Sequence, residues 1–415
     1  MAESSSIPVG IDALHVFPGR ARLDVNRLAQ ARGLDSQRFQ NLLLREKTVA
    51  LPFEDPVSFA VNAAWPLLRS LTQAERERIE LLIVATESGL DFGKAISAYV
   101  HHYLQLGRHC RNFEVKQACY GGTAAVQMAA AWLRGAAPPD AQALVITTDV
   151  ARPIPHTYAE PAQGAAAVAM LLSRQPRLLT LEPGANGYYG YEVMDSCRPT
   201  AEIETGDADL SLLTYLDCIE HSFQHYCQRV GAVDFQSYFD YLAFHTPFGG
   251  MAKGAHRTLL RRLKRLPPAA IEDDFRRRME PALLFCQQVG NIYSGSLYLA
   301  LAGLLEQGDF HTMRRIGLFS YGSGCCSEFF SGLAGPEASA LIRNAALPAR
   351  LAERHDLSMA EYEALLALNR GALFGVQNAV LDDPRFMGFY QRLFAGRGLL
   401  TLERIVDFHR EYRWS

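Results

Sequence analysis

Short apolar runs alternate with longer amphipathic segments along most of the chain. The apolar runs predict buried strands over 80–86, 143–148, 165–172, 238–244 and 315–320. The segments between them repeat apolar residues at helical spacing and predict helices over 25–32, 57–71, 93–106, 123–133, 213–229, 251–266 and 296–305. This alternation indicates a layered α/β fold. Beyond about residue 340, Ala, Leu and Glu dominate, so a mostly helical segment is expected there, with a break at 382–384.

Composition and charge argue against several classes of protein. The 415 residues, 49% hydrophobic and 20% charged, are typical of a soluble globular protein with one large core or two fused ones. A net charge of −3 argues against nucleic acid as a partner. No apolar run approaches the ~20 residues of a membrane span. Residues 1–6 show no signal peptide, so a cytoplasmic protein is expected.

Cys119 lies between a strand-like segment and a helix of small residues, 124–133. A helix N-terminus presents unpaired N–H groups and about half a positive charge, which favours thiolate over thiol. Gly121 and Gly122 would let backbone amides approach a bound group, as an oxyanion hole requires. A nucleophilic cysteine is therefore one interpretation, and a buried inert cysteine is the other.

Two further segments favour the nucleophile. His245 ends an apolar strand, so it is expected to face a cleft beyond the sheet edge; a satisfied core histidine is the alternative. Asn291 opens the helix predicted at 296–305, where it could also serve only as an N-cap. Cys119, His245 and Asn291 together resemble the Cys-His-Asn set of condensing enzymes with the thiolase fold, in which the cysteine carries an acyl group and the other two bind the carbonyl oxygen.

A glutamate distinguishes between two kinds of condensation. Glu87 follows the apolar run 81–86, and burial there would raise its pKa and strengthen it as a base. Enzymes that decarboxylate malonyl groups need no such base, whereas one that uses an acetyl thioester must remove a methyl proton. Glu87 has the chemistry for that step, and a capping glutamate of the next helix is the alternative.

Six motifs in order resemble the 3-hydroxy-3-methylglutaryl-CoA synthase family between about residues 80 and 330. They are Thr86-Glu87-Ser88, Ala118-Cys119-Tyr120, Glu160-Pro161-Ala162-Gln163-Gly164-Ala165, Phe244-His245-Thr246-Pro247-Phe248, the segment 290–298 and Phe319-Ser320-Tyr321-Gly322-Ser323-Gly324. The resemblance implies an α/β, thiolase-like layered αβαβα fold made of two related halves. The first half, 1–178, would carry Glu87 and Cys119, and the second, 179–415, would carry His245 and Asn291.

The resemblance also implies the roles of these residues. Cys119 would be the acylated nucleophile, Glu87 the general acid/base and His245 the residue that binds and polarises the acceptor. The acceptor-site residues would be Asn291, Ser323, Gly322 and Tyr321. The family expectation is a homodimer without a bound cofactor or metal, whose acyl groups arrive on phosphopantetheine.

Further segments are similar to one branch of this family, the stand-alone synthases that install β-branches in polyketide pathways. They are 119–123, 184–189, 192–195, 325–332 and 408–412. In that branch, an acetyl group from one acyl carrier protein would be condensed onto the β-ketone of a chain on another and then hydrolysed. One departure from the mevalonate-type pattern is Pro153, where that pattern has a tyrosine that reaches the active site. The residues that contact the acceptor near this loop are therefore not predicted.

Three alternatives remain. The first is the mevalonate-pathway synthase, which would use acetyl-CoA and acetoacetyl-CoA. The second is a decarboxylating ketoacyl synthase, against which Glu87 argues. The third is a non-catalytic scaffold for carrier proteins, which the intact set of Glu87, Cys119 and His245 makes the least favoured.

Two clusters have both a functional and a structural interpretation. The basic run that includes Lys253, Arg257 and Arg261 is either a solvated helix face or, as we favour, a landing surface for an acidic carrier protein or its phosphopantetheine phosphate. Eight cysteines without regular spacing indicate no disulfide framework. Cys218, His221 and His225 share one helix face and could hold a metal, but an ordinary amphipathic helix is the favoured interpretation.

Overall fold

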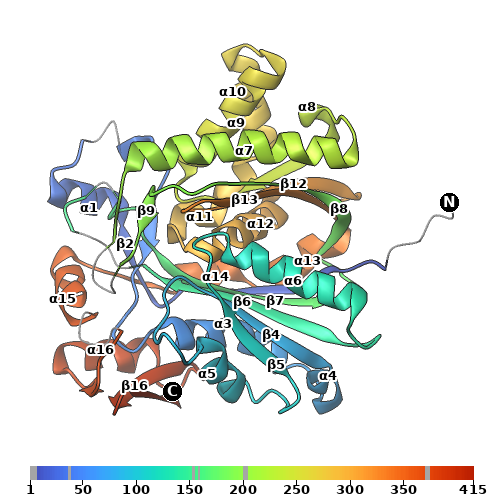
Figure 1. Cartoon of the computed structure of the whole chain (residues 1–415). Coiled ribbons are helices and arrows are strands. Elements are labelled where there is room, and N and C mark those ends of the chain that lie inside the picture. The colour runs from blue at the N-terminus through green and yellow to red at the C-terminus, as the bar shows by residue number, and fades with distance from the viewer. Residues whose placement is uncertain (1–6, 36–38, 152–154, 158, 200–203, 370–373) are drawn as a thin grey trace.

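A mixed sheet of nine strands runs through the described part of this computed structural model, which comprises residues 7–35, 39–151, 155–157, 159–199, 204–369 and 374–415 (Figure 1). Its order is β11-β12-β13-β8-β1-β7-β6-β4-β5. These strands are β1 (Gly10–Phe17), β4 (Ile79–Ala85), β5 (Arg111–Val115), β6 (Gln142–Val150), β7 (Ala165–Ser173), β8 (Leu179–Gly190), β11 (Tyr241–Phe244), β12 (Arg314–Gly322) and β13 (Cys326–Ala334). The sheet has two arms. The first consists of β1, β7, β6, β4 and β5, and the second of β8, β13, β12 and β11. The arms meet where β1 pairs with β8 through two residues of each strand.

The two arms repeat one topology. In the first arm β4 is parallel to β6, and β6, β7 and β1 follow as antiparallel neighbours. In the second arm β11 is parallel to β12, and β12, β13 and β8 follow in the same way. The repeat supports the two related halves expected from the sequence. The boundary expected between residues 178 and 179 falls where β8 begins.

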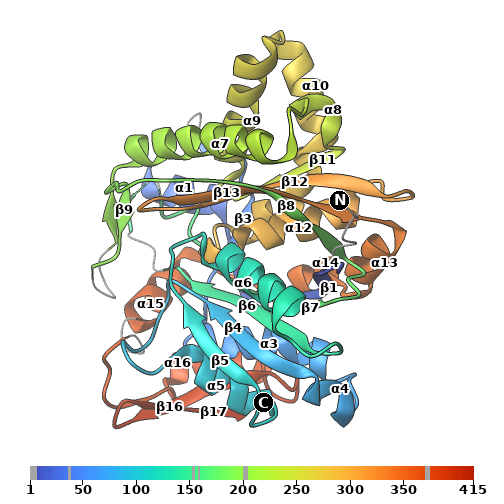
Figure 2. The same ribbon diagram turned by 45° about the vertical axis from the view of Figure 1, so that its right-hand side comes forward.

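Helices cover both faces of each arm and complete five layers. Between the arms lie α6 (Gly121–Gly135) and α12 (Ser296–Gln307), while α3 (Pro56–Leu68) and α5 (Ile96–Tyr103) cover the outer face of the first arm (Figures 1 and 2). The outer face of the second arm is covered by α7 (Ala208–Val230) and α9 (Gly249–Lys264). Three apolar clusters fill the four interfaces between sheet and helices, one of them on both sides of the central helices. The thiolase-like layered α/β fold expected from the sequence is therefore confirmed.

The remaining elements are short or lie at the edges of these layers. The helices are α1 (Val25–Arg32), α4 (Gln73–Glu77), α8 (Phe235–Tyr238), α10 (Pro268–Arg278), α11 (Leu283–Val289), α13 (Pro336–Asn344), α14 (Leu347–Ala352), α15 (Met359–Asn369) and α16 (Pro384–Leu393), with 3-10 turns η1 (Glu280–Ala282) and η2 (Tyr293–Gly295). The strands are β2 (Ala21–Asp24), β3 (Glu46–Thr48), β9 (Ser196–Cys197), β10 (Thr205–Gly206), β14 (His355–Asp356), β15 (Ala379–Val380), β16 (Leu400–Val406) and β17 (His409–Trp414). Residues 235–238 are helical, so the strand expected over 238–244 is shorter than predicted.

The C-terminal segment is not mostly helical, and this expectation was wrong for residues 400–414. Here β16 and β17 form an antiparallel hairpin whose turn residues, Asp407 and Phe408, both have positive φ angles of 47° and 67°. Two-residue turns of this kind match the twist of the strands but usually carry Asn or Gly, so the turn was not visible in the sequence. The hairpin packs onto α3 through buried Leu400, Leu402 and Tyr412.

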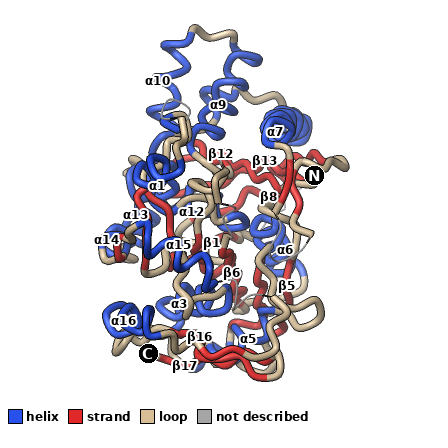
Figure 3. The backbone as a smooth tube through the Cα atoms, turned by 90° about the vertical axis from the view of Figure 1, so that its left-hand side faces the viewer, coloured by secondary structure: helices blue, strands red, loops and turns tan. Residues whose placement is uncertain are grey.

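A helical hairpin of α9 and α10 projects from the second arm (Figure 3). Its base is held by buried Asp274, which accepts hydrogen bonds from Arg278 and lies 2.7 Å from His256 Nε2. Of the helices that the structure describes, none has both the length and the apolar character needed to cross a bilayer.

Candidate functional site

A pocket of about 1620 Å³ is lined by residues from both arms of the sheet. Most of the site residues expected from the sequence line it, namely Glu87, Cys119, His245, Asn291, Tyr321 and Ser323. Lys253, Arg257, Arg261 and Gly322 are not among its lining residues. The fold therefore brings together the Cys-His-Asn set and the glutamate from four separate segments.

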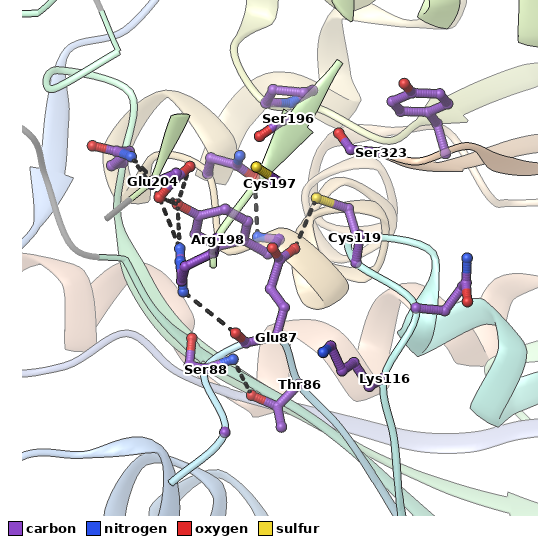
Figure 4. A pocket seen from close by; sticks show the side chains of 18 of the residues that line it. Thr86, Glu87, Ser88, Lys116, Cys119, Ser196, Cys197, Arg198, Glu204 and Ser323 are labelled. Carbon is purple, nitrogen blue, oxygen red and sulfur yellow. Dashed lines mark hydrogen bonds and ion pairs between the residues drawn. The ribbon is translucent and has the colours of Figure 1, made fainter. Parts of the chain in front are cut away.

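Cys119 lies in the turn between β5 and α6. The turn places Ala118 at a positive φ of 44°, and α6 begins two residues after the cysteine. The alanine-rich sequence of α6 favours the helix, which begins at Gly121. Cys119 is half-buried and faces Glu87, as Figure 4 shows.

The thiol of Cys119 donates a hydrogen bond to Oε1 of Glu87 over 3.2 Å. Burial raises the pKa of Cys119 well above its usual range, and the Glu87 charge adds to this effect. Burial and then the charge of Asp149 likewise raise the pKa of Glu87, as expected from the sequence. The expected thiolate is thus wrong for the resting site, because burial and a neighbouring carboxylate outweigh the helix N-terminus. Cys119 is instead a thiol placed beside its own base.

Asp149 fixes the segment that carries Glu87. From the end of β6, its Oδ1 accepts hydrogen bonds from Thr86 Oγ1 (3.1 Å), Glu87 N (2.9 Å) and Ser88 Oγ (2.9 Å). Its Oδ2 accepts from both N (3.1 Å) and Oγ (2.5 Å) of Ser294, in η2. The buried carboxylate of Asp149 therefore connects the segment of the general base Glu87, in the first arm, to the turn that follows Asn291.

His245 directly follows β11, and its main chain is fixed on both sides. Its N–H donates to Phe319 O over 2.7 Å, and its carbonyl accepts from Tyr215 OH over 2.6 Å. Burial lowers the pKa of His245 to about 3, so the ring is neutral. Nδ1 is buried and has no hydrogen-bond partner among the described residues. A neutral imidazole in this position can donate to or accept from a substrate oxygen without carrying charge.

The side chain of Asn291 is oriented by its own neighbours. Its Oδ1 accepts from Tyr293 N and Ser296 Oγ, each over 2.9 Å. The side-chain oxygen therefore fixes the turn before α12, but Asn291 is not an N-cap, since Ile292 caps η2 and Gly295 caps α12. The capping interpretation was wrong in this respect. The amide nitrogen is left as the donor that can reach the pocket.

The end of β12, with Tyr321, Gly322 and the following Ser323, is anchored by a second buried carboxylate. Asp195 accepts from Tyr321 OH (2.5 Å) and from Gly324 N (2.9 Å). A Cβ on Gly322 would lie 2.7 Å from both Gln117 O and Tyr120 N. Gly322 therefore permits close contact with the cysteine turn, which is a different use from the substrate contact expected of it.

The glycines after Cys119 are also used for packing. A Cβ on Gly122 would lie 2.2 Å from the carbonyl oxygen of Ser294, so only glycine lets α6 approach η2 this closely. The amides of Tyr120 and Gly121 donate within the turn, to Gln117 O and Ala118 O. The amide of Gly121 is therefore used within the turn, whereas Gly122 is needed for helix packing; that their amides bind a substrate group stays a prediction.

Sequence reasoning missed a polar network on one wall of the pocket. Arg198 pairs with Glu204 over 2.8 Å and donates to the main-chain oxygen of Glu87 over 3.3 Å. Gln163 and the hydroxyl of Tyr293 also bind Glu204. Arg198 and Glu204 lie on the β9–β10 segment, where no pattern marks them. Only Gln163 and Tyr293 belong to motifs that the sequence showed.

The proposed carrier-contact residues lie on the projecting hairpin. Met251 in the first turn of α9 lines the pocket, but Lys253 pairs with Glu272 over 2.8 Å. Arg257 and Arg261 are exposed farther along the helix. Their role in carrier binding stays a prediction, and Pro153 lies outside the described residues.

The three candidate metal ligands on α7 have separate contacts. Cys218 is buried with its sulfur 3.6 Å from that of Cys325, whereas His221 stacks on Tyr189 and His225 contacts the main chain of Tyr188. Within the described ranges, no group of three or more His, Cys, Asp or Glu side chains is arranged to hold a metal ion.

Comparison with known proteins gives consistent matches over the whole chain. Family models for the N-terminal and C-terminal parts of hydroxymethylglutaryl-coenzyme A synthase match residues 7–176 and 255–379. The chain is 50% identical to the polyketide biosynthesis 3-hydroxy-3-methylglutaryl-ACP synthase PksG of Bacillus subtilis, over 98% of this chain and 99% of that protein. It is 37% identical to hydroxymethylglutaryl-CoA synthase of Enterococcus faecalis, over 86% and 91% of the two chains. The curacin pathway HMG synthase in complex with holo donor-ACP superposes with a TM-score of 0.96 at 54% identity, over 98% and 100% of the two chains.

The Cys119–Glu87 contact predicts how the thiol responds to loss of the carboxylate. Glu87→Gln removes a negative charge that raises the pKa of Cys119. The variant should therefore be alkylated by iodoacetamide at Cys119 several-fold faster than wild type at mildly alkaline pH. The pH–rate profile of Cys119 labelling, followed by peptide mass spectrometry, measures this shift.

Glu182→Gln is the control, because Glu182 pairs with Arg315 on the other arm and should leave the profile unchanged. An unchanged or slower reaction in Glu87→Gln would contradict the electrostatic description of the site.

Proposed function

Because the chain belongs to the hydroxymethylglutaryl-CoA synthase family, we propose that it condenses an acetyl group held on Cys119 with the β-ketone of a polyketide intermediate and so installs a β-branch. It is an acyl-transferring enzyme of the synthase class. Both acyl groups would arrive on the phosphopantetheine arms of acyl carrier proteins, in the cytoplasm. The observation that carries the proposal is the hydrogen bond from the Cys119 thiol to Glu87 inside a pocket shared with His245 and Asn291.

Acetyl transfer is the first step. As the sulfur of Cys119 attacks the acetyl carbonyl carbon, its proton passes to the Glu87 carboxylate at 3.2 Å. The bond between the acetyl carbon and the donor sulfur then breaks, and the donor thiol takes up the proton. The raised pKa of Glu87 suits this exchange, since a base titrating nearer neutrality can both accept and return a proton.

Carbon–carbon bond formation follows from the same geometry. Glu87 removes a proton from the methyl group of acetyl-Cys119, and the resulting enolate attacks the ketone carbon of the acceptor. The ketone oxygen becomes an alkoxide and takes up a proton to give a tertiary alcohol. His245 and the amide nitrogen of Asn291 are the neutral groups that would bind this oxygen. Water then attacks the Cys119 thioester, which frees the thiol and leaves a carboxymethyl branch.

The comparisons favour a carrier protein over free CoA as the donor. The relative at 50% identity is described as an HMG-ACP synthase, and the curacin enzyme was solved in complex with its holo and acetyl donor-ACP. The mevalonate-type alternative rests on lower identity, 37% to the Enterococcus faecalis enzyme. The half-buried base Glu87 argues against decarboxylating chemistry, and its contact with Cys119 argues against a scaffold without activity.

Replacing the base Glu87 should affect condensation but leave acetylation of Cys119 possible. Glu87→Ala should still gain an acetyl mass at Cys119, because acyl transfer does not require removal of a C–H proton. Loss of the Glu87 charge also lowers the pKa of the thiol, so water can take the proton that Glu87 accepts in the wild type. Its condensation rate should fall by at least the ~10²–10⁴ typical of general acid–base catalysis. Intact-protein mass spectrometry and product analysis measure the two steps.

Cys119→Ala is the control for the labelled site and should gain no acetyl mass. Near-normal product from Glu87→Ala, or an acetyl group found on another cysteine, would contradict the assigned roles.

The exposed part of α9 supplies a test of carrier docking. If the Arg257 and Arg261 surface receives an acidic carrier protein, reversing both residues to glutamate should slow carrier-dependent acetylation roughly tenfold or more at low ionic strength. The loss should shrink as salt rises, because exposed charges are screened. Acetylation from free acetyl-CoA, measured in parallel, should fall much less.

The matched control reverses Arg69 and Arg343, which are exposed and do not line the pocket. An equal loss with both donors would mean damage to the pocket or the fold. Wild-type rates with the carrier would show that it docks elsewhere.

We also propose a homodimer formed through β5. This strand is one end of the nine-stranded sheet, so its outer row of main-chain groups is open to a second strand. Met128 of the adjacent α6 is 48% exposed, which gives the same face an apolar element. Pairing between the β5 edges of two copies would cover both.

The dimer predicts a mass near twice 46.0 kDa by light scattering. It also predicts slow hydrogen exchange of β5 amides that becomes faster on dilution, while the exchange of β11, at the other sheet end, stays unchanged. A monomeric mass, or a dimer whose β5 amides do not respond to dilution, would contradict this interface.

A further inference from the structure

A buried ion cluster outside the pocket joins segments that are far apart in the sequence. Its centre is Glu160, whose side chain is fully buried. The carboxylate accepts two hydrogen bonds from Arg32 over 2.9 Å each and one from His156 N over 2.8 Å. The hydroxyl of Tyr362 donates a further bond over 3.1 Å. The cluster thus links α1, the loop before β7 and α15, and α1 and α15 lie side by side in Figure 1.

The main chain of Glu160 is held as firmly as its side chain. Lys47 of β3, also fully buried, donates from Nζ to the carbonyl oxygen of Glu160 over 2.5 Å and contacts Tyr362 OH at 3.4 Å. Although burial disfavours charge on Glu160, its contacts with Arg32 hold the pKa of this carboxylate below the usual range. A buried charge with this many partners tolerates little movement, because losing one partner leaves the charge uncompensated.

The loop that follows Glu160 contacts Asn291 directly. The carbonyl of Ala162 accepts from Asn291 N over 2.6 Å, and Gly164 N donates to Asn291 O over 3.0 Å. A Cβ on Gly164 would lie 2.1 Å from the carbonyl oxygen of Val289, so the two backbones are in close contact here. The side-chain oxygen of Asn291 accepts hydrogen bonds from Tyr293 and Ser296. The position of the amide nitrogen in the pocket therefore depends on the backbone position of Asn291, which the 162–164 segment fixes.

We infer that Glu160, clamped by Arg32, Lys47 and Tyr362, is a positioning residue that sets the place of Asn291 in the pocket. The inference rests on the proposed function, in which Asn291 binds the acceptor oxygen during condensation. The side chains of Cys119 and Glu87 bond to each other, and Asp149 binds the Glu87 main chain, so neither residue is bonded to a member of the Glu160 cluster. The cluster therefore supports condensation and is not required for acetyl transfer to Cys119.

Two variants weaken the clamp to different degrees. Tyr362→Phe removes one hydroxyl donor and preserves the shape of the side chain. Glu160→Gln removes the central charge and leaves Arg32 without its bidentate partner. Tyr412→Phe is the matched control, because Tyr412 is also a buried tyrosine whose hydroxyl donates, over 2.6 Å, to an arginine-paired carboxylate, that of Asp55.

The readouts are acetylation of Cys119 by intact mass, kcat for condensation and melting temperature. Condensation should fall several-fold in Tyr362→Phe and roughly 10- to 100-fold in Glu160→Gln, since small misplacements of a binding group are costly. Acetylation should remain at the wild-type rate in both variants. Tyr412→Phe should condense normally, even where its melting temperature falls as much as that of Tyr362→Phe.

The outcomes separate this inference from the proposed function. Normal condensation in Glu160→Gln, or parallel loss of acetylation and condensation in Tyr362→Phe, would overturn the positioning role. If Glu160→Gln does not fold, Tyr362→Phe decides the question by the same comparison. A wild-type protein that takes up no acetyl group would instead contradict the proposed function itself.

Discussion

The active site depends on the buried carboxylate of Asp149. It accepts hydrogen bonds from the segment that carries Glu87 and from the turn that follows Asn291, and so joins the two arms of the sheet at the reaction centre. Each buried donor left without its partner would cost about 1–3 kcal/mol. The charge of Asp149 also adds to the effect of burial in raising the pKa of Glu87. One residue therefore contributes to both the geometry and the basicity of the site.

The resting site around the sulfur is organised to move a proton without building up charge. Cys119 is a thiol that donates to a carboxylate of raised pKa, and His245 is a neutral ring. New negative charge develops during the reaction on the enolate and then on the acceptor oxygen, where neutral donors are already in place. Arg198 is the positive group beside Glu87, and its pairing with Glu204 limits how far it lowers the pKa of that base.

The sequence was sufficient for the layered fold and for the residues that carry the chemistry. Strand and helix periodicity indicated the layered α/β fold, and the family resemblance implied the two related halves. The motifs located Glu87, Cys119, His245 and Asn291. It did not show why Gly122 is needed, because that depends on the carbonyl of Ser294 in a distant segment.

The pairing of Arg198 with Glu204 was equally hidden, since neither residue belongs to a periodic pattern. The thiol state of Cys119 could not be predicted either. The helix N-terminus is visible in the sequence, whereas the burial and the neighbouring charge that outweigh it arise only from packing. Local patterns thus predicted the elements and the reactive residues, but not the long-range contacts that set their ionisation.

The central claim is that the carbanion arises by removal of a proton from an acetyl group on Cys119. The most direct measurement uses a donor whose acetyl methyl carries three deuterium atoms, with mass spectrometry of the condensed product. The account predicts a branch methylene that retains two deuterium atoms, because one is lost to Glu87 and two remain on carbon. A product formed only from a malonyl donor, with no label from acetyl, would contradict it.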